Sequence, residues 1–147
     1  MKVRIGPYRK NRATRVEIDP HDTWSMDHTL AMIIHPMLVQ LKATKHGAPM
    51  VDMNDVPKEL RATKKQLDAY GKTGDVDPKH FERWDWILDE MIWAFEHKSK
   101  EIDAADMCRD KCSNFADPIC KACLDDTQER LTNAFVLFGK YYENLWD

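Results

Sequence analysis

One predicted helix carries two stripes of large side chains, and this pattern constrains the fold more than any other feature of the sequence. Asp77 is suited to cap the helix and Pro78 to open it. The two stripes, about a quarter turn apart, are Phe81, Trp84, Leu88, Met91 and Phe95 and, beside them, Trp86, Glu90, Trp93 and His97. A helix with two such stripes is covered on two sides, so the sequence predicts a helical bundle or a partner surface.

A second segment also repeats apolar residues at helical spacing. It is expected to begin between Asp22 and Ser25, to kink at Pro36, and to end with Gly47 in the left-handed conformation. Its predicted core stripe is Leu30, Ile33, Ile34, Met37, Leu38 and Leu41.

A third helix is expected to begin near Asp125 or Asp126. Its predicted seam is Leu131, Phe135, Phe138, Tyr142 and Leu145, flanked by Ala134, Leu137 and Tyr141. Gly139 predicts the close approach of another element, because glycine otherwise costs a helix interior about 1 kcal/mol. Pro57 predicts the start of a short helix, and the Gly-, Asp- and Pro-rich residues 68–78 predict a linker.

Apolar and charged residues alternate in two short segments near the N-terminus, 2–5 and 15–18, with Gly6-Pro7 and Asn11-Arg12 between them. Alternation with period two predicts a half-buried β-ribbon with its arginines in water. Together with the helices this gives the expected fold. It is a single, mainly α domain over residues 1–147: an irregular bundle of three long helices, a basic β-ribbon (1–20) and a Cys-rich knuckle (103–126). The sequence contains no run of 18 apolar residues, so no membrane-spanning helix is expected.

Charge is uneven along the chain, whose net charge is −3. The first 15 residues hold six basic and no acidic side chains (+6), and the other 132 hold 16 basic and 25 acidic ones (−9). Such an arm could bind a phosphate-bearing partner through bidentate arginines, or fold onto its own acidic body. The acidic net charge argues against broad binding of nucleic acid.

All four cysteines lie within sixteen residues, at Cys108, Cys112, Cys120 and Cys123. Two close pairs predict a structural zinc site, in which four thiolates leave no position open for catalysis. The seven-residue gap between the pairs is shorter than in most four-cysteine zinc motifs. Free thiols in a reducing cytosol and a pair of disulfides are the alternatives.

Aromatic and cationic residues suggest a site for a nucleotide-like ligand, because arginine binds phosphate and an indole ring stacks on a base. The candidate ligand-binding residues are Arg4, Tyr8, Arg9, Trp24, Asp27, His28, Arg83, Trp84 and Glu90. The hypothesis requires the polar flanks of the helices to meet the ribbon at one pocket. The alternative is that most of these rings belong to the core and the carboxylates to a solvated face.

Signatures of catalysis are few. No nucleophile elbow, Walker loop or glycine-rich dinucleotide motif is present. A metal-dependent nucleotide hydrolase would have to assemble its site from Asp27, His28, Asp89 and Glu90. The sequence therefore favours a non-enzymatic binding protein and keeps the hydrolase as an alternative.

Three blocks of the chain resemble a family of small proteins from tailed bacteriophages. They are DTWSMDHTLAMIIHPMLVQLK (22–42, followed by residues 45–49 and 55–57), the block 81–96 with RWDWILDEMIWAFE, and LFGKYYENLWD (137–147); the opening Ile5-Gly6-Pro7-Tyr8 is similar too. The family has no settled activity. The resemblance therefore implies an origin, a phage product made in the cytoplasm of the bacterial host, and no mechanism.

We therefore expect a phage accessory protein that binds and neutralises a host factor or a nucleotide-like small ligand, in host modulation or counter-defence. Its expected partner is a host protein or a phosphate-bearing small molecule, without a membrane. The alternatives are the hydrolase and a component of the virion or replication complex that acts through protein contacts. Exposure of Trp86 and Trp93 would point to a homodimer.

Overall fold

The computed structural model describes residues 2–7, 9–111 and 118–146. The chain is mainly α-helical and has a two-stranded antiparallel sheet at its N-terminus, as the sequence predicted. The strands and α-helices are β1 (Lys2–Ile5), β2 (Thr14–Glu17), α1 (Met26–Thr44), α2 (Lys64–Thr73), α3 (His80–Ser99), α4 (Ala104–Cys108) and α5 (Pro118–Lys140). Short 3₁₀ helices lie between or after them, at Pro20–Thr23, Lys58–Leu60, Arg109–Lys111 and Tyr142–Asn144.

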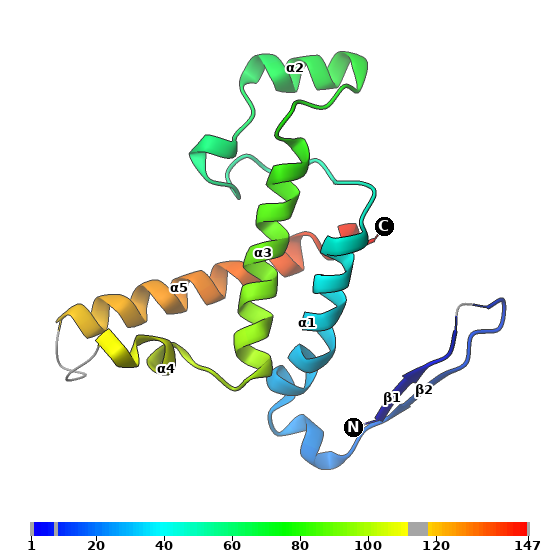
Figure 1. The fold of residues 1–147 in the computed structure, drawn as a ribbon, viewed down its shortest axis with the longest axis vertical. Coiled ribbons are helices and arrows are strands. Elements are labelled where there is room, and N and C mark those ends of the chain that lie inside the picture. The colour runs from blue at the N-terminus through cyan, green and yellow to red at the C-terminus, as the bar shows by residue number, and fades with distance from the viewer. Residues whose placement is uncertain (1, 8, 112–117, 147) are drawn as a thin grey trace.

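Helix α3 is the centre of the molecule. Helix α1 packs along it, and α5 crosses it (Figure 1). The main core lies where these helices meet the loop after α1, and its most buried members are Ala31, Leu38, Val51, Val56, Trp84, Ile87, Leu88 and Met91. Phe81, predicted for the first stripe of α3, is exposed in the first turn of the helix.

The second stripe of α3 is half-buried within its own chain. Trp93 packs beside α5, where the guanidinium of Arg130 lies 3.9 Å from the centre of the Trp93 ring. Trp86 packs against the edge of the main core. The exposure of Trp86 and Trp93 that would have pointed to a homodimer is therefore not found.

The burial of residues in α1 differs in part from the predicted core stripe. Ala31 and Leu38 are buried, but Leu30 is 42% and Met37 64% exposed. At 100° per residue the predicted stripe was too wide, and α3 covers only one side of α1. The helix ends at Thr44 with Lys45 in an extended conformation, so the prediction that Gly47 caps it was wrong.

Two further boundaries differ from the prediction. Residues 68–73 belong to α2, whose capping box of Thr63 and Gln66 starts the helix before the predicted linker; Gly74 ends it at φ 76°. Helix α5 begins at Pro118, about two turns before Asp125. A Cβ at Gly139 would meet nothing within 4 Å, so the predicted close approach at this glycine was wrong.

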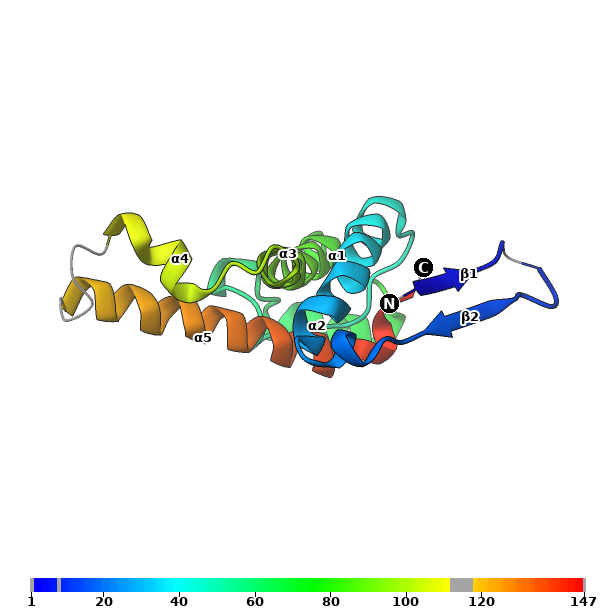
Figure 2. The ribbon, with the colours of Figure 1, turned by 90° about the horizontal axis from the view of Figure 1, so that it is seen from below.

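The hairpin projects beyond the helices (Figures 1 and 2). Its register pairs Lys2 with Glu17, Val3 with Val16, Arg4 with Arg15 and Ile5 with Thr14. Residues opposite each other share a face, so one face is apolar and the other charged, and all eight are exposed. The alternative in which the arm folds onto its own acidic body is not the arrangement observed. No helix in the described part of the chain has the length and apolar character to span a bilayer.

Candidate functional site

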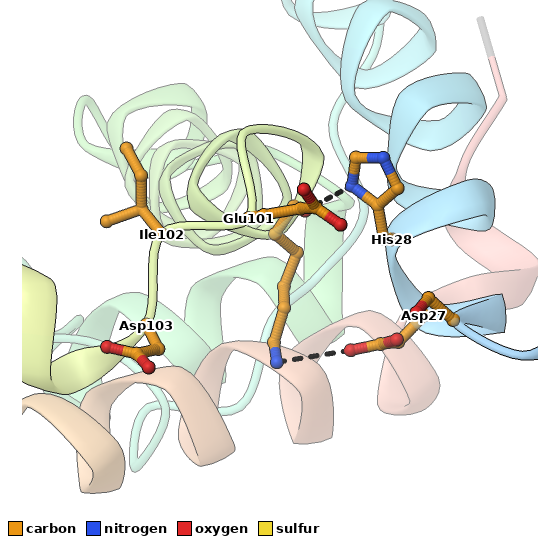
Figure 3. A pocket seen from close by; sticks show the side chains of 7 residues that line it. Asp27, His28, Glu101, Ile102 and Asp103 are labelled. Atoms are coloured by element: carbon orange, nitrogen blue, oxygen red, sulfur yellow. Dashed lines mark hydrogen bonds and ion pairs between the residues drawn. The ribbon is translucent and has the colours of Figure 1, made fainter.

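A shallow pocket of about 160 Å³ lies where the N-terminus of α1 meets the C-terminus of α3 (Figure 3). The residues that line it are Ser25, Asp27, His28, Lys98, Glu101, Ile102 and Asp103. Of the candidate ligand-binding residues, it gathers Asp27 and His28. The opposite wall comes from a segment about 70 residues later in the chain.

Two contacts to Lys98 join the α1 side of this pocket to the α3 side. The Nδ1 of His28 lies 3.0 Å from the backbone oxygen of Lys98. Because a carbonyl only accepts, the Nδ1 of His28 donates this hydrogen bond. The Nζ of Lys98 donates to Asp27 at 3.2 Å. This hydrogen bond, followed by one from the backbone N–H of His28, holds the pKa of Asp27 below its ordinary value.

Glu101 gives the rim of the pocket its shape. It has φ 55°, the only left-handed non-glycine residue within the described ranges. The N–H of Ile102 donates to the oxygen of His97 at 2.9 Å, and the N–H of Glu101 to that of Lys98 at 3.2 Å. These are the two bonds of a Schellman cap, in which the left-handed position usually holds glycine. Here a charged side chain occupies it.

The pocket is poorly suited to a nucleotide. Ligand pockets for drug-sized molecules hold about 300–1,000 Å³, and this one is smaller. Three carboxylates line it (Asp27, Glu101 and Asp103) against one lysine that is already paired. Their charge repels phosphate.

A second hollow, of about 250 Å³, lies on the charged face of the hairpin. Lys2, Arg4, Arg15 and Glu17 line it, and Arg15 forms an ion pair with Glu17. Arg9 is exposed in the turn. The turn is closed by the Nε of Arg12, which donates to the oxygen of Gly6 at 2.8 Å. Tyr8 lies outside the described residues.

Trp24 lies in the segment that joins the hairpin to α1 (residues 18–25), which we call the elbow. It is 86% exposed and packs edge-on against His21, with the ring centres 5.6 Å apart. An indole in this position can stack on an incoming ring or side chain. Of the predicted aromatic residues that the structure describes, Trp24 is exposed and Trp84 is buried.

Arg83 and Trp84 lie away from these surfaces. Both are fully buried. The guanidinium of Arg83 pairs with the carboxylate of Asp77, and its Nη1 donates to the oxygen of Leu60 at 2.9 Å. Trp84 packs edge-on against Tyr141 in the core. The tertiary structure therefore uses both residues to hold the fold.

The four residues of the predicted hydrolase site are held by three different partners. Glu90 accepts two hydrogen bonds from Arg130, at 2.8 and 2.7 Å, which tie α3 to α5. Asp89 accepts from Lys42 of α1 at 2.5 Å. Asp27 and His28 contact Lys98, as described above. Within the described ranges, no three His, Cys, Asp or Glu side chains are placed to hold a metal ion.

The cysteine segment is described in an oxidised form. Cys108 of α4 and Cys123 of α5 form a disulfide, and Cys120 is also disulfide-bonded. Cys112 lies outside the described residues. Sulfurs in a disulfide do not ligate zinc, so the predicted zinc site applies to the reduced chain, where it stays a prediction.

Sequence reasoning missed two polar groups. Lys98, Glu101 and Asp103 were absent from the predicted site because they follow no helical period. The other group joins the loop after α1 to the end of α5: the Nζ of Lys140 lies 3.1 Å from Asp52 and 2.7 Å from Asp55. No local signal in the sequence connects residues almost 90 positions apart.

Comparison of the chain with models of protein families, with curated proteins and with solved structures finds no match in any of the three.

Proposed function

We propose that this chain is a non-enzymatic accessory protein that captures an anionic partner with the charged face of its hairpin. The resemblance of its sequence blocks to tailed-phage proteins makes the expected setting a phage-infected bacterium. The expected partner is a host factor or a nucleotide-like small ligand, which the protein would neutralise.

The observation that carries this proposal is the cross-strand pair Arg4 and Arg15. Like charges directly opposite each other destabilise an antiparallel pair, and here they lie opposite each other on an exposed ribbon. Lys2 adds a third positive charge to the same hollow, against the single carboxylate of Glu17. An anion seated between the guanidinium groups would remove the repulsion and accept planar, bidentate hydrogen bonds.

The exposed Trp24 supports the same reading. It lies between α1 and the 3₁₀ helix that follows the hairpin, where its exposed ring can cover an apolar or aromatic part of a partner. The contacts on the hairpin are exposed, so they should be weakened by salt. We therefore expect binding that falls as ionic strength rises.

The geometry favours this reading over the hydrolase. Asp89 and Glu90 are already held by Lys42 and Arg130 on different helices. A metal would have to break both ion pairs to recruit them. Phosphate release from a nucleotide with added Mg²⁺ or Mn²⁺ would nevertheless contradict the non-enzymatic proposal.

The test is calorimetry at low and high salt with ATP and a cyclic dinucleotide as probes, alongside affinity capture of host proteins. Each captured protein is purified and titrated again. The variant is Arg4→Gln with Arg15→Gln. The matched control is Arg109→Gln, because Arg109 is an exposed arginine elsewhere on the chain.

Each charge-assisted hydrogen bond contributes about 1.5–3 kcal/mol, so loss of the two arginines should weaken binding by more than about tenfold. The control variant should bind as the wild type does. If no probe or purified host protein binds in a manner that depends on the arginines, the proposal is wrong. In that case a role in the virion or replication complex through other contacts becomes the better explanation.

A further inference from the structure

Helix α1 carries a second apolar stripe that flanks the face packed on α3, about a third of a turn from the buried Ala31 and Leu38. It consists of Met26, Leu30, Ile33 and Met37, spaced by four, three and four residues. Three of these side chains are exposed and Ile33 is half-buried. From Met26 to Met37 the stripe is about 16 Å long, at 1.5 Å per residue. Spacing of this kind is typical of a helix face that packs against a partner.

The hairpin presents a matching apolar face. Val3, Ile5 and Val16 lie on the side opposite the arginines, and Ile18 continues the same face beyond β2. All four are exposed. Along β2 this face is about 13 Å long, at about 3.3 Å per residue. An isolated two-stranded hairpin is marginally stable in water and needs packing against a third element.

The elbow between the two surfaces holds them apart within one chain. The carboxylate of Asp19 accepts from the N–H of His21 at 2.9 Å, and the N–H of Asp19 donates to Asp22 at 2.8 Å. The hydroxyl of Thr29 donates to the oxygen of Asp22 at 3.2 Å and fastens the elbow to α1. The hairpin consequently diverges from α1 (Figure 1). Folding it back onto its own helix would break this cap.

We propose that a second copy of the chain covers both surfaces, in a symmetric dimer where each hairpin lies with its apolar face on the α1 stripe of the other copy. The two apolar faces have similar lengths. One two-fold axis satisfies both copies at once, as in isologous dimers.

The uneven distribution of charge along the chain supports a second copy as the partner that covers these two surfaces. Residues 1–15 carry +6 and the rest of the chain −9. Two bodies of −9 repel each other, and each exchanged arm lays its net charge of +6 on the acidic body of the other copy. The arginine face of each hairpin would remain turned outward.

The first test is the mass of the full chain in solution. Light scattering after size-exclusion chromatography should give twice 17.2 kDa for the wild type at high micromolar concentration. Val16→Ser and Met37→Gln should each shift the population to monomer. At a dilution where the wild type is also monomeric, they should leave the thermal midpoint nearly unchanged, because both side chains are exposed in the single chain. Matched controls are Val136→Ser on α5 and Met32→Gln on α1, which are exposed apolar residues off the two surfaces.

The second test locates the contact. Benzoylphenylalanine is placed at position 16 of an unlabelled chain, which is mixed with ¹⁵N-labelled chain and irradiated. The proposal expects crosslinks from position 16 to ¹⁵N-labelled peptides containing residues 26–37.

Three results would overturn the dimer: a wild type that is monomeric at every concentration, a dimer that survives both stripe variants, or crosslinks confined to one chain. None of these depends on the arginines. Arg4→Gln with Arg15→Gln should leave the dimer intact, so failure of the dimer and failure of the proposed function are separate results.

Discussion

The carboxylate of Asp77 meets the guanidinium of Arg83 inside the protein, six residues apart in sequence and both shielded from water. The Arg83 side chain is completely buried and that of Asp77 is 8% exposed. Arg83 also reaches the oxygen of Leu60, so the pair holds the loop before α2 against the first turn of α3. The carboxylate additionally accepts from the N–H of Lys79 at 3.0 Å. Lys79 is the N-cap residue of α3, two residues after the cap predicted at Asp77.

Removing one partner of this pair should be costly. Asp77→Asn leaves the buried guanidinium without a counter-charge, and breaking a buried pair in this way costs about 3–5 kcal/mol. Arg83→Met removes the charge and keeps the bulk, so it should cost less when combined with Asp77→Asn than the two changes cost separately. Urea denaturation of the three variants measures this coupling, and additive effects would contradict it.

The same pair should make stability depend on pH in acid. The hydrogen bond from Arg83 holds the pKa of Asp77 below its ordinary 3.8, against the opposing effect of burial. The stabilisation is complete above the unfolded-state pKa and is lost as pH falls through the lower native pKa. The gap in unfolding free energy between wild type and Asp77→Asn should therefore narrow from pH 6 towards strong acid. A gap that stays constant would rule this out.

Tyr141 should give a pH dependence of the opposite kind. Burial, followed by the hydrogen bond from its hydroxyl to Asp55 at 2.5 Å, raises its pKa to about 12 from 10.0. A raised native pKa contributes stability below pH 10, and this is lost as pH rises towards 12. Tyr141→Phe should cost about 1–3 kcal/mol at pH 7 and lose less stability in base than the wild type. Denaturation at pH 8 and pH 11 checks both statements.

Glu101 offers a stabilising substitution. A non-glycine residue in the left-handed region costs about 1–2 kcal/mol, and Glu101 is held there by the cap at the end of α3. Glu101→Gly should raise the unfolding free energy by about 1 kcal/mol, less the entropy that glycine adds to the unfolded chain. Glu101→Ala is the control, because alanine removes the carboxylate and keeps the strain. If both variants change the unfolding free energy equally, the cause is the loss of the carboxylate and not the relief of backbone strain.

The Cys108–Cys123 disulfide closes a loop with a sequence separation of 15. Cross-linking a loop of this length stabilises a fold by about 3 kcal/mol in the chain-entropy description, so mild reduction or Cys108→Ser should lower the thermal midpoint. The reduced wild type then tests the zinc prediction by elemental analysis. About one zinc per chain, absent from Cys108→Ser, would support it, and a metal-free reduced chain would end it.

Some parts of the fold could be predicted from the sequence because the patterns that specify them are local. The alternation in the two N-terminal segments predicts a ribbon with one apolar and one charged face, which the structure has, but the predicted half-burial was wrong because both faces are exposed. The stripe of Trp84, Leu88 and Met91 follows one helix face in the same way. The T-x-x-Q box at Thr63 was an equally local signal for α2, and it lay upstream of the predicted linker.

The candidate site was less accessible to prediction. Nine residues were expected to meet, and the structure distributes the eight that it describes among the core, an α3–α5 ion pair, the hairpin, the elbow and one pocket. Arg83 has the chemistry of a phosphate ligand, yet the fold buries it and pairs it with Asp77, six residues before it. Residue type shows what a side chain can bind, and only the fold shows which partner reaches it first.

The sequence by itself determined the elements that a period of 3.6 or 2 residues can specify: the helices, the two-faced hairpin and the imbalance of charge between arm and body. Only the tertiary structure decided which face of α1 meets α3, that Lys98 reaches Asp27, and that Leu30 and Met37 face water. The physical reason is that periodicity is set along one element, whereas burial and pairing depend on contacts between segments that the order of residues does not place beside each other.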